Sequence, residues 1–285
     1  MCKLKTPRSE DLSFMERFLA RHAESSMIIR SNLRRVGVAY EGAAYQGEYK
    51  LAIDAHNEII GILVHYWNGS LMVQAPDEAA LCQLLYDFRA SRTRSISCVM
   101  GPSTQVTKIV QFLSLDENTF SLNAYEDLFS LDLVDLHCDG LNLEEQVVEA
   151  RSISRDLLWA WMKAYEMEAL GAQASEALDV RLEDRISRMS KFGDAWALLQ
   201  AGSPVSLSGF NARLPDMVQV GPVWTPPEFR NRGYARRLVA ETLRMARAEG
   251  VNKAILFTDN PAAAKAYRAL GFEVVGEFRL AFLKE

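Results

Sequence analysis

The stretch "EFRNRGYARRL", from Glu228 to Leu238, gathers four arginines around one glycine. The strand-like run "DMVQVGPVWT" (Asp216–Thr225) precedes it, and apolar residues recur at helical spacing from Gly233 onward. The first N–H groups of a helix have no intrahelical partner and carry the positive end of the helix dipole. A glycine at that point lets the main chain approach a ligand without a Cβ in the way. The stretch therefore predicts a site for an anion such as a diphosphate.

The simpler alternative is a solvated basic turn that follows Pro226–Pro227 and starts a surface helix. Short motifs match by chance, so the surrounding sequence has to decide between these interpretations.

Composition supports a small anionic ligand. The chain has 285 residues, enough for two ordinary domains, and its 49% hydrophobic and 24% charged residues are typical of a globular protein. A net charge of −5 disfavours non-specific attraction to nucleic acid or anionic membranes, so we expect neither as a partner. The basic turn is a local exception on an acidic chain.

Cysteine and histidine usage predicts no metal site and no disulfide framework. Four cysteines and four histidines are scattered, without a C-x-x-C pair. The N-terminal stretch "MCKLKTPRSEDL" lacks the apolar core of a signal peptide, and the apolar run "IIGILVHYW" is too short to span a bilayer. We therefore expect a cytoplasmic location.

The C-terminal half contains an antiparallel meander followed by helices and strands. "DAWALLQAG", "PVSLSGFNA" and Asp216–Thr225 are strand-like, and a helix is expected from Gly233 to Gly250. A buried strand at Lys253–Asp259 precedes a short helix at Asn260–Phe272, with Asn260 as its N-cap, and "EVVGEFRLAFL" closes the sheet.

The N-terminal half repeats this order more faintly. Three strands ("GEYKLAIDA", "IIGILVHYWN", "SLMVQA") precede a helix at Asp77–Ala90, a strand, a helix at "GPSTQVTKIVQFL" and closing strands. The same order twice indicates a tandem repeat with a period of roughly 140 residues. The join is expected in the polar stretch His137–Gln146, which gives domains at 1–138 and 139–285.

Two motifs resemble those of the GNAT N-acetyltransferase superfamily. Arg230, Gly233 and Ala235 match its acetyl-CoA motif, Arg/Gln-x-x-Gly-x-Gly/Ala after a bulged strand. "NPAAAKAYRALGF" matches its second motif at Asn260, Ala263, Tyr267, Gly271 and Phe272. The resemblance is specific over Asp194–Phe272, loose over Val147–Gly193 and limited to element order in the N-terminal half. It implies an α+β fold of two tandem GNAT-like domains, each a mixed, mostly antiparallel sheet flanked by helices.

The resemblance also implies an activity, the transfer of acetyl from acetyl-CoA to a primary amine by direct attack in a ternary complex. The acceptor would be a small-molecule or peptide amine. The pantetheine arm would pair with backbone groups at Val223 and Thr225, beside a break at Gly221–Pro222. The implied cofactor-binding residues are Val223, Trp224, Thr225, Arg230, Asn231, Arg232, Gly233, Tyr234, Ala235, Arg236, Asn260 and Ala263.

Tyr267 is implied as the acid that protonates the departing thiolate, although it also fits an apolar helix stripe as a core tyrosine. The sequence indicates no convincing general base. Glu166 and Glu168 are more typical of solvated helix charges, and a water chain is equally compatible.

The N-terminal copy lacks these features. At "QAPDEAAL" it has no Gly-x-Ala turn and no arginine, and Asp77 and Glu78 occupy the positive end of the helix, so we expect no cofactor there. Two other functions stay open for the chain: a transferase that uses another acyl-CoA or an aminoacyl donor, and a non-catalytic regulatory module that binds CoA. The oligomeric state stays open as well.

Overall fold

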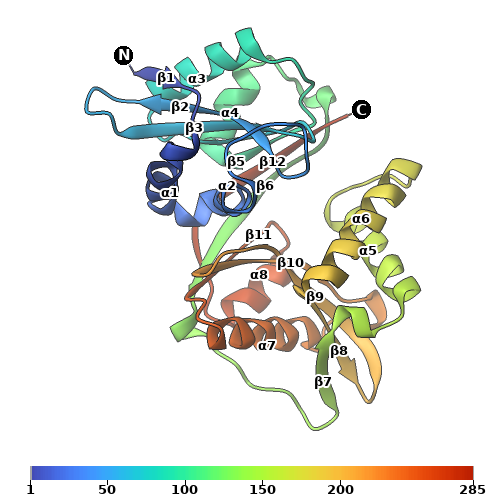
Figure 1. The fold of residues 1–285 in the computed structure, drawn as a ribbon. Coiled ribbons are helices and arrows are strands. Elements are labelled where there is room, and N and C mark those ends of the chain that lie inside the picture. Colours follow the sequence, from blue (N-terminus) through green and yellow to red (C-terminus); the bar gives the residue numbers. More distant parts are fainter. Residues whose placement is uncertain (1, 285) are drawn as a thin grey trace. The chain divides into compact units, whose positions relative to one another are not determined.

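The computed structural model describes residues 2–284 and divides into two compact units (Figure 1). The first unit holds Met1–Leu128 together with Val275–Glu285, and the second holds Phe129–Val274.

The first unit is a sheet with helices on two sides (Figure 1). Its strand order is β1-β2-β3-β4-β5-β12-β6, in which β4 and β5 are parallel. Helices α3 and α4 share one core cluster with the sheet, whereas α1 and α2 pack on β3, β4 and β5. The strands are β1 (Lys3–Lys5), β2 (Gly47–Ile53), β3 (Ile59–Tyr66), β4 (Ser70–Gln74), β5 (Cys98–Pro102), β6 (Phe120–Asp132) and β12 (Glu273–Leu283); the helices are α1 (Leu12–Ala20), α2 (Ala23–Val36), α3 (Glu78–Ser91) and α4 (Ser103–Phe112).

The second unit has the strand order β6-β11-β10-β9-β8-β7, in which β10 and β11 are parallel. Its strands are β7 (Glu145–Glu149), β8 (Ala195–Gln200), β9 (Ser203–Arg213), β10 (Met217–Trp224) and β11 (Lys253–Thr258); its helices are α5 (Arg155–Ala169), α6 (Glu176–Phe192), α7 (Tyr234–Ala248) and α8 (Pro261–Arg268). Because successive strand residues point to opposite faces, Trp196 packs with α7 and α8 while Ala195 packs with α5 and α6.

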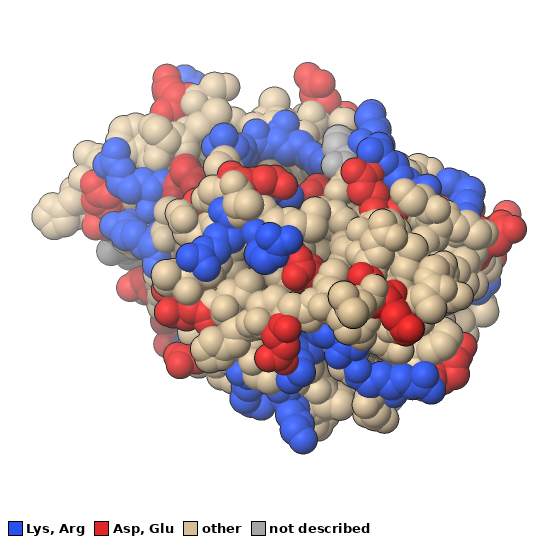
Figure 2. All heavy atoms as spheres, turned by 90° about the horizontal axis from the view of Figure 1, so that it is seen from below, with Lys and Arg blue, Asp and Glu red and all other residues tan. Residues whose placement is uncertain are grey.

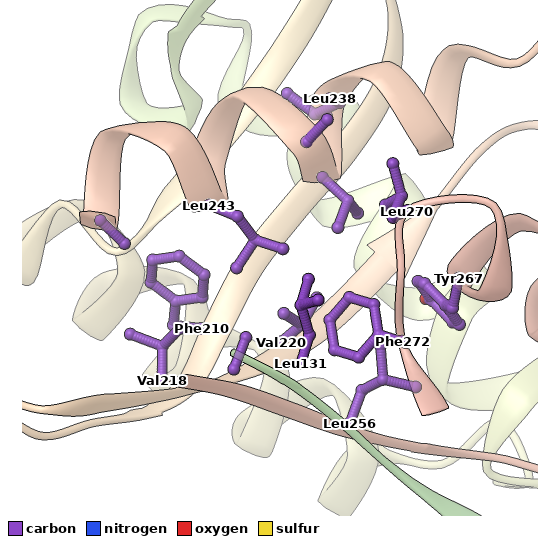
Figure 3. Close-up of a cluster of buried hydrophobic side chains, with 14 of the residues drawn as sticks. Leu131, Phe210, Val218, Val220, Leu238, Leu243, Leu256, Tyr267, Leu270 and Phe272 are labelled. Atoms are coloured by element: carbon purple, nitrogen blue, oxygen red, sulfur yellow. The ribbon is translucent and has the colours of Figure 1, made fainter. Parts of the chain in front are cut away.

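The main core of the second unit lies between α7 and the sheet (Figure 3). Leu238 and Leu243 of α7 face Val218 and Val220 of β10, and both leucines are fully buried. The apolar stripe read from the sequence is therefore the face that attaches α7 to the sheet, and the arginines of α7 lie outside it.

The predicted repeat of element order is confirmed. The order β2-β3-β4-α3-β5-α4-β6 in one half corresponds to β8-β9-β10-α7-β11-α8-β12 in the other. Each copy contains one parallel strand pair, β4–β5 or β10–β11, bridged by a helix.

The compact units differ from the division expected at residue 138. The first division falls inside β6, between Leu128 and Phe129. The last strand belongs to the first unit because Phe278–Phe282 of β12 pair with Cys98–Pro102 of β5. The polar stretch expected to join the domains also runs into a strand, β7, which pairs with β8. As a boundary between repeats, 138/139 stays a prediction.

Charges of both signs alternate on the face that Figure 2 shows, without one large patch of a single sign. Among residues 2–284, no helix combines the length and apolar character needed to cross a bilayer. The same residues contain no cluster of three or more histidine, cysteine or acidic side chains that could hold a metal ion.

Candidate active site

Strands β10 and β11 separate part of the way along their length. Their ladder covers only Met217–Gln219 against Lys253–Ile255, although β10 continues to Trp224 and β11 to Thr258. The backbone of β10 beyond Gln219 is therefore unpaired on the β11 side. Such an opening can accept an extended ligand that adds main-chain hydrogen bonds like a further strand.

A bulge in β10 marks the beginning of the opening. In the ladder with β9, Val220 pairs with Phe210 and Val223 with Ser208, so Gly221 and Pro222 together oppose a single residue. Gly221 has φ +147°, and a Cβ there would lie 2.4 Å from Nδ2 of Asn211. This register shift confirms the predicted break at Gly221–Pro222. Proline donates no ladder hydrogen bond, and a Cβ at Gly221 would force the Asn211 side chain to move.

Side chains fix the end of β10. The Ser206 hydroxyl donates to the carbonyl oxygen of Trp224 at 3.1 Å and shares a hydrogen bond with Oγ1 of Thr225 at 2.8 Å. Nε of Arg230 donates to the carbonyl oxygen of Thr225 at 2.9 Å. The Arg230 side chain therefore holds the backbone of Thr225 in place.

The turn before α7 has a left-handed backbone at two positions. Gly233 is the N-cap of α7 in the left-handed region (φ 76°, ψ 6°), and no side chain caps this helix among the described residues. Asn231 is also left-handed, at φ 62°. The first N–H groups of α7, those of Tyr234, Ala235 and Arg236, are consequently free of a side-chain acceptor and suit an anion.

Most arginines of the turn already form ion pairs. Arg230 contacts Glu168 at 2.9 Å and lies 5.0 Å from the ring centroid of Trp224, and Arg236 contacts Asp139 at 2.9 Å. Arg232 is exposed and makes no ion pair with the residues that the structure describes. The pairs of Arg230 and Arg236 are solvent-accessible, so they stabilise the turn little and an incoming phosphate can compete for either arginine.

A buried ion pair that sequence analysis missed supports the turn from below. Arg237 donates to both carboxylate oxygens of Glu145, whose side chain is 0% exposed. Burial acts to raise the pKa of Glu145, but the Arg237 hydrogen bonds and the Asn142 N–H hold that pKa below its ordinary value. Nη1 of Arg237 lies 2.8 Å from the position of a Cβ on Gly233. The partners lie far apart in sequence, so no local pattern could reveal them.

Helix α8 begins as the sequence predicts. Oδ1 of Asn260 accepts from the N–H groups of Ala262 and Ala263 at 2.9 and 3.2 Å, which confirms the N-cap. The side-chain oxygen of Asn260 is therefore occupied by capping, and any contact of this residue with a cofactor falls to its amide NH₂ group or its backbone.

Tyr267 lies in the core cluster, with 9% of its surface exposed and its ring centroid 5.8 Å from that of Phe272 (Figure 3). Burial raises the pKa of the Tyr267 phenol, and the neighbouring phenol of Tyr165 on α5 adds to the rise. Tyr267 is therefore a core residue, as its place on an apolar helix stripe suggests, and its hydroxyl stays protonated at neutral pH, as a proton donor requires.

The two glutamates considered as bases are both ion-paired. Glu166 accepts from Arg185 of α6, which also donates to Oδ1 of Asn211 at 3.0 Å, and Glu168 pairs with Arg230. In both glutamates the carboxylate is therefore already engaged by a guanidinium group. The geometry indicates a structural use for both glutamates.

Three buried polar atoms at the bulge have no hydrogen-bond partner among residues 2–284. They are Oε1 of Gln219, where the register shift begins, Oγ of Ser208, opposite Val223 in the ladder, and Nε1 of Trp224. The Trp224 side chain otherwise packs with α5 and α6. Since buried polar atoms are normally paired, their presence here fits a region that is completed by a ligand or water.

The equivalent region of the first unit is closed by its own side chains. Oε1 of the buried Gln105 accepts from the N–H of Ala75, directly after β4, at 2.7 Å. Oδ1 of Asp77 caps α3 by accepting from the N–H of Ala80 at 2.7 Å. In the first unit the backbone N–H after β4 is therefore already hydrogen-bonded to a side-chain amide, and the N-terminus of α3 is already capped by a carboxylate.

Comparisons with known proteins agree with this geometry. Residues 155–272 match a model of the acetyltransferase (GNAT) family. A GCN5-related N-acetyltransferase from Sphaerobacter thermophilus is similar in structure, with a TM-score of 0.60 and 15% identity over 98% of this chain and 94% of that one. A tandem GNAT protein from the clavulanic acid biosynthesis pathway gives a TM-score of 0.57 and 13% identity over 100% and 99% of the two chains.

A Drosophila protein gives a TM-score of 0.67 at 9% identity, with 99% of each chain covered. At these identities the structural likeness shows a shared fold. No curated protein matches the sequence significantly.

The open strand pair, the uncapped helix and the repeated element order define a protein of the tandem GNAT fold. Within the second unit, residues 155–272 match the model of the GNAT acetyltransferase family, so this segment is a GNAT-type domain.

Proposed function

We propose that the second unit transfers an acetyl group from acetyl-CoA to a primary amine. The observation that carries this proposal is the opening between β10 and β11 after Gln219–Ile255, in the same unit as the uncapped start of α7 at Gly233. An opening that accepts an extended arm and a turn that accepts a diphosphate together suit coenzyme A.

The residues proposed to bind the cofactor fall into three groups. Backbone groups of Val223, Trp224 and Thr225 would pair with the pantetheine arm. Around the diphosphate, the main chain of Asn231, Gly233, Tyr234 and Ala235 would supply N–H groups, and Arg230, Arg232 and Arg236 positive charge. Asn260 and Ala263, at the start of α8, would border the arm.

In the proposed reaction, a neutral amine attacks the thioester carbonyl and the carbon–sulfur bond breaks. An alkylamine has a pKa of about 10.4, so its deprotonation at pH 7 costs about 4–5 kcal/mol. With Glu166 and Glu168 both ion-paired, we assign this deprotonation to water. The backbone N–H of Val223 is the proposed donor to the carbonyl oxygen as negative charge develops there.

Tyr267 is the proposed donor to the departing sulfur. A thiol has a pKa of about 8.5 and an unperturbed phenol about 10, so full proton transfer from a phenol to a thiolate costs about 2 kcal/mol. The raised pKa of Tyr267 adds to this cost. We therefore assign Tyr267 a hydrogen bond that stabilises the sulfur as the bond breaks, with the proton finally replaced from solvent.

Release of free CoA from acetyl-CoA, measured across polyamines, amino acids, aminoglycosides and peptide amines, tests the proposal. Calorimetric titration with CoA runs in parallel. Release of free CoA from acetyl-CoA that occurs only with some of the amines supports the transferase. Tight CoA binding without release from any amine would instead support the regulatory module, and release only from other acyl-CoA thioesters would reassign the donor.

A further inference from the structure

Arg279 of β12 is a deeply buried cation in the first unit. It is 3% exposed, Nε donates to Oδ1 of Asn123 at 2.9 Å, and Nη1 donates to Oγ1 of Thr107 at 3.0 Å. The guanidinium carbon lies 4.6 Å from the ring centroid of Tyr125. These contacts come from α4 and β6, and every residue involved belongs to the first unit.

None of these partners is a carboxylate. Asn123 in turn donates Nδ2 to the carboxylate of Glu117, which has no direct contact with Arg279. Arg279 forms no ion pair with any residue in the range 2–284. A guanidinium stays charged at all physiological pH values, so its positive charge is buried against neutral groups alone.

The other buried aspartate, glutamate and arginine side chains of the described residues are all paired. Arg30 contacts Glu16 at 2.6 Å, Asp11 contacts Lys5 at 2.6 Å, Glu145 contacts Arg237 at 2.5 Å and Glu241 contacts Arg244 at 2.8 Å. Buried charges are normally paired because desolvation of a lone ion is costly. Arg279 departs from a rule that the rest of this chain follows.

The neutral contacts fix the guanidinium without exhausting its donors. An arginine has five N–H donors, and two of them are used here. The remaining donors can bind two oxygens of one carboxylate or phosphate in parallel. The Tyr125 ring that covers the guanidinium is 46% exposed, so the site lies directly beneath the surface.

We propose that Arg279 forms the centre of an oxyanion site in the first unit, which takes the carboxylate or phosphate group of a small ligand. Thr107 lends its hydroxyl proton as a further donor, because its oxygen already accepts from Nη1. The site is separate from the closed region around Ala75 and Gln105. The first unit then has a binding role of its own, whatever the second unit catalyses.

Thermal unfolding of the full chain tests this site. Sodium phosphate and sodium acetate are titrated against sodium chloride at equal ionic strength, with and without saturating CoA, which occupies the α7 turn. The wild-type chain should gain roughly 5 °C or more in melting temperature at a hundredfold excess of the bound anion over its Kd. Arg279→Gln should lose this shift, and Arg89→Gln, the matched removal of one exposed charge, should keep it.

A response to phosphate alone identifies a phosphate site, and a response to acetate alone a carboxylate site. If neither anion stabilises the wild-type chain, or if Arg279→Gln responds as the wild type does, the site does not exist. Should Arg279→Gln fail to fold, Arg279→Lys keeps the charge without the planar fork and should weaken anion binding at least about tenfold. The comparison without CoA remains decisive even if the second unit binds no CoA.

Discussion

Gly233 meets two separate requirements, a left-handed backbone and the absence of a Cβ. Alanine at this φ costs about 1–2 kcal/mol, and its methyl group would also press on Nη1 of Arg237, which Glu145 holds in place. We predict that Gly233→Ala weakens CoA binding about tenfold or more in calorimetry.

Gly202→Ala provides the matched control. Gly202 has φ +80°, and no heavy atom of the described residues lies within 4 Å of the position that an alanine methyl group would take there. This variant should cost similar stability and leave the CoA affinity unchanged. Equal CoA affinities in the two variants would refute the role of the turn.

Tyr267→Phe separates chemistry from packing. The ring that packs on Phe272 is retained, so the melting temperature and CoA affinity should stay close to those of the wild type, while kcat falls by roughly 10²-fold or more. Steady-state kinetics and calorimetry check both parts. Tyr49→Phe, a buried tyrosine of the first unit, should leave kcat unchanged; a Tyr267→Phe enzyme of full activity would exclude the proposed donor.

Glu145 makes stability depend on pH. Its folded pKa lies below the unfolded value of about 4.3, so its contribution is fully present above that value and is lost as the pH falls through the folded pKa. Glu145→Gln leaves the partly buried Arg237, whose side chain is 19% exposed, without a counter-charge and should cost about 2–4 kcal/mol at pH 7.

Urea unfolding at pH 7, 5 and 3.5 measures this cost, which should shrink at the lowest pH. The control Glu249→Gln removes a carboxylate that is 58% exposed and pairs with Arg213, and it should cost less than about 1 kcal/mol. A cost for Glu145→Gln that is constant with pH would contradict the ion-pair account.

Among single residues, sequence reasoning located those whose role is local. Gly233, Asn260 and Gly221 were predictable because backbone conformation and capping depend on near neighbours. The partners of Arg230 and Arg237 were not, since Glu168 and Glu145 reach them only through the tertiary fold. Pairing of these arginines is the reason that the turn carries less free charge than its sequence suggests.

At the scale of elements, the two copies differ at the end of the parallel strand pair. In the first unit, the Gln105 side chain accepts a hydrogen bond from the backbone N–H of Ala75. Gln105→Ala should leave that N–H buried and unpaired, which costs about 1–3 kcal/mol. Because Asp77 still caps α3, no second CoA should bind, and calorimetry should give the wild-type stoichiometry.

Thr104→Ala, an exposed change on the same helix, controls for loss of side-chain helix contacts in unfolding experiments. If Gln105→Ala were as stable as Thr104→Ala, the hydrogen bond between Gln105 and the Ala75 N–H would contribute nothing to stability. A gain of a second CoA would show that the side chain alone had kept the cofactor out.

Among the elements, the strands and the helices that follow them were predictable from alternation, helical spacing and caps. The helices α1, α2 and α6 and the strand β7 were not predicted. Helices α2 and α6 are rich in charged residues with only a narrow apolar stripe, and β7 begins in a polar stretch with glycine. Their positions depend on packing against sheets that are assembled from distant segments.

For the whole molecule, the pairing of β12 with β5 predicts that the halves cannot be separated at the boundary expected after residue 138. A fragment of residues 1–138 lacks the strand that pairs with β5 and the buried side chains of Phe278 and Ala281. It should aggregate or unfold without a cooperative transition. Fusion of residues 275–285 to that fragment through a flexible linker should restore a cooperative thermal transition in circular dichroism.

A matched fusion with Phe278→Asp and Ala281→Asp should fail to restore it. If residues 1–138 alone melt cooperatively at the temperature of the fusion, β12 is dispensable for the first unit. Neither the repeat nor the motifs could reveal that β12 pairs with β5, because strand order in a sheet is set by long-range pairing.

The place of β12 in the first unit also has a consequence in time. On the ribosome, the segment that completes the sheet of the first unit emerges only after all of Phe129–Val274. At typical synthesis rates this delay is roughly 7–30 s. Until then the edge of the nascent β5 that later pairs with β12 has unpaired backbone groups, which can pair with the wrong strand or with another chain unless chaperones cover them. The half made first is thus the half that matures last.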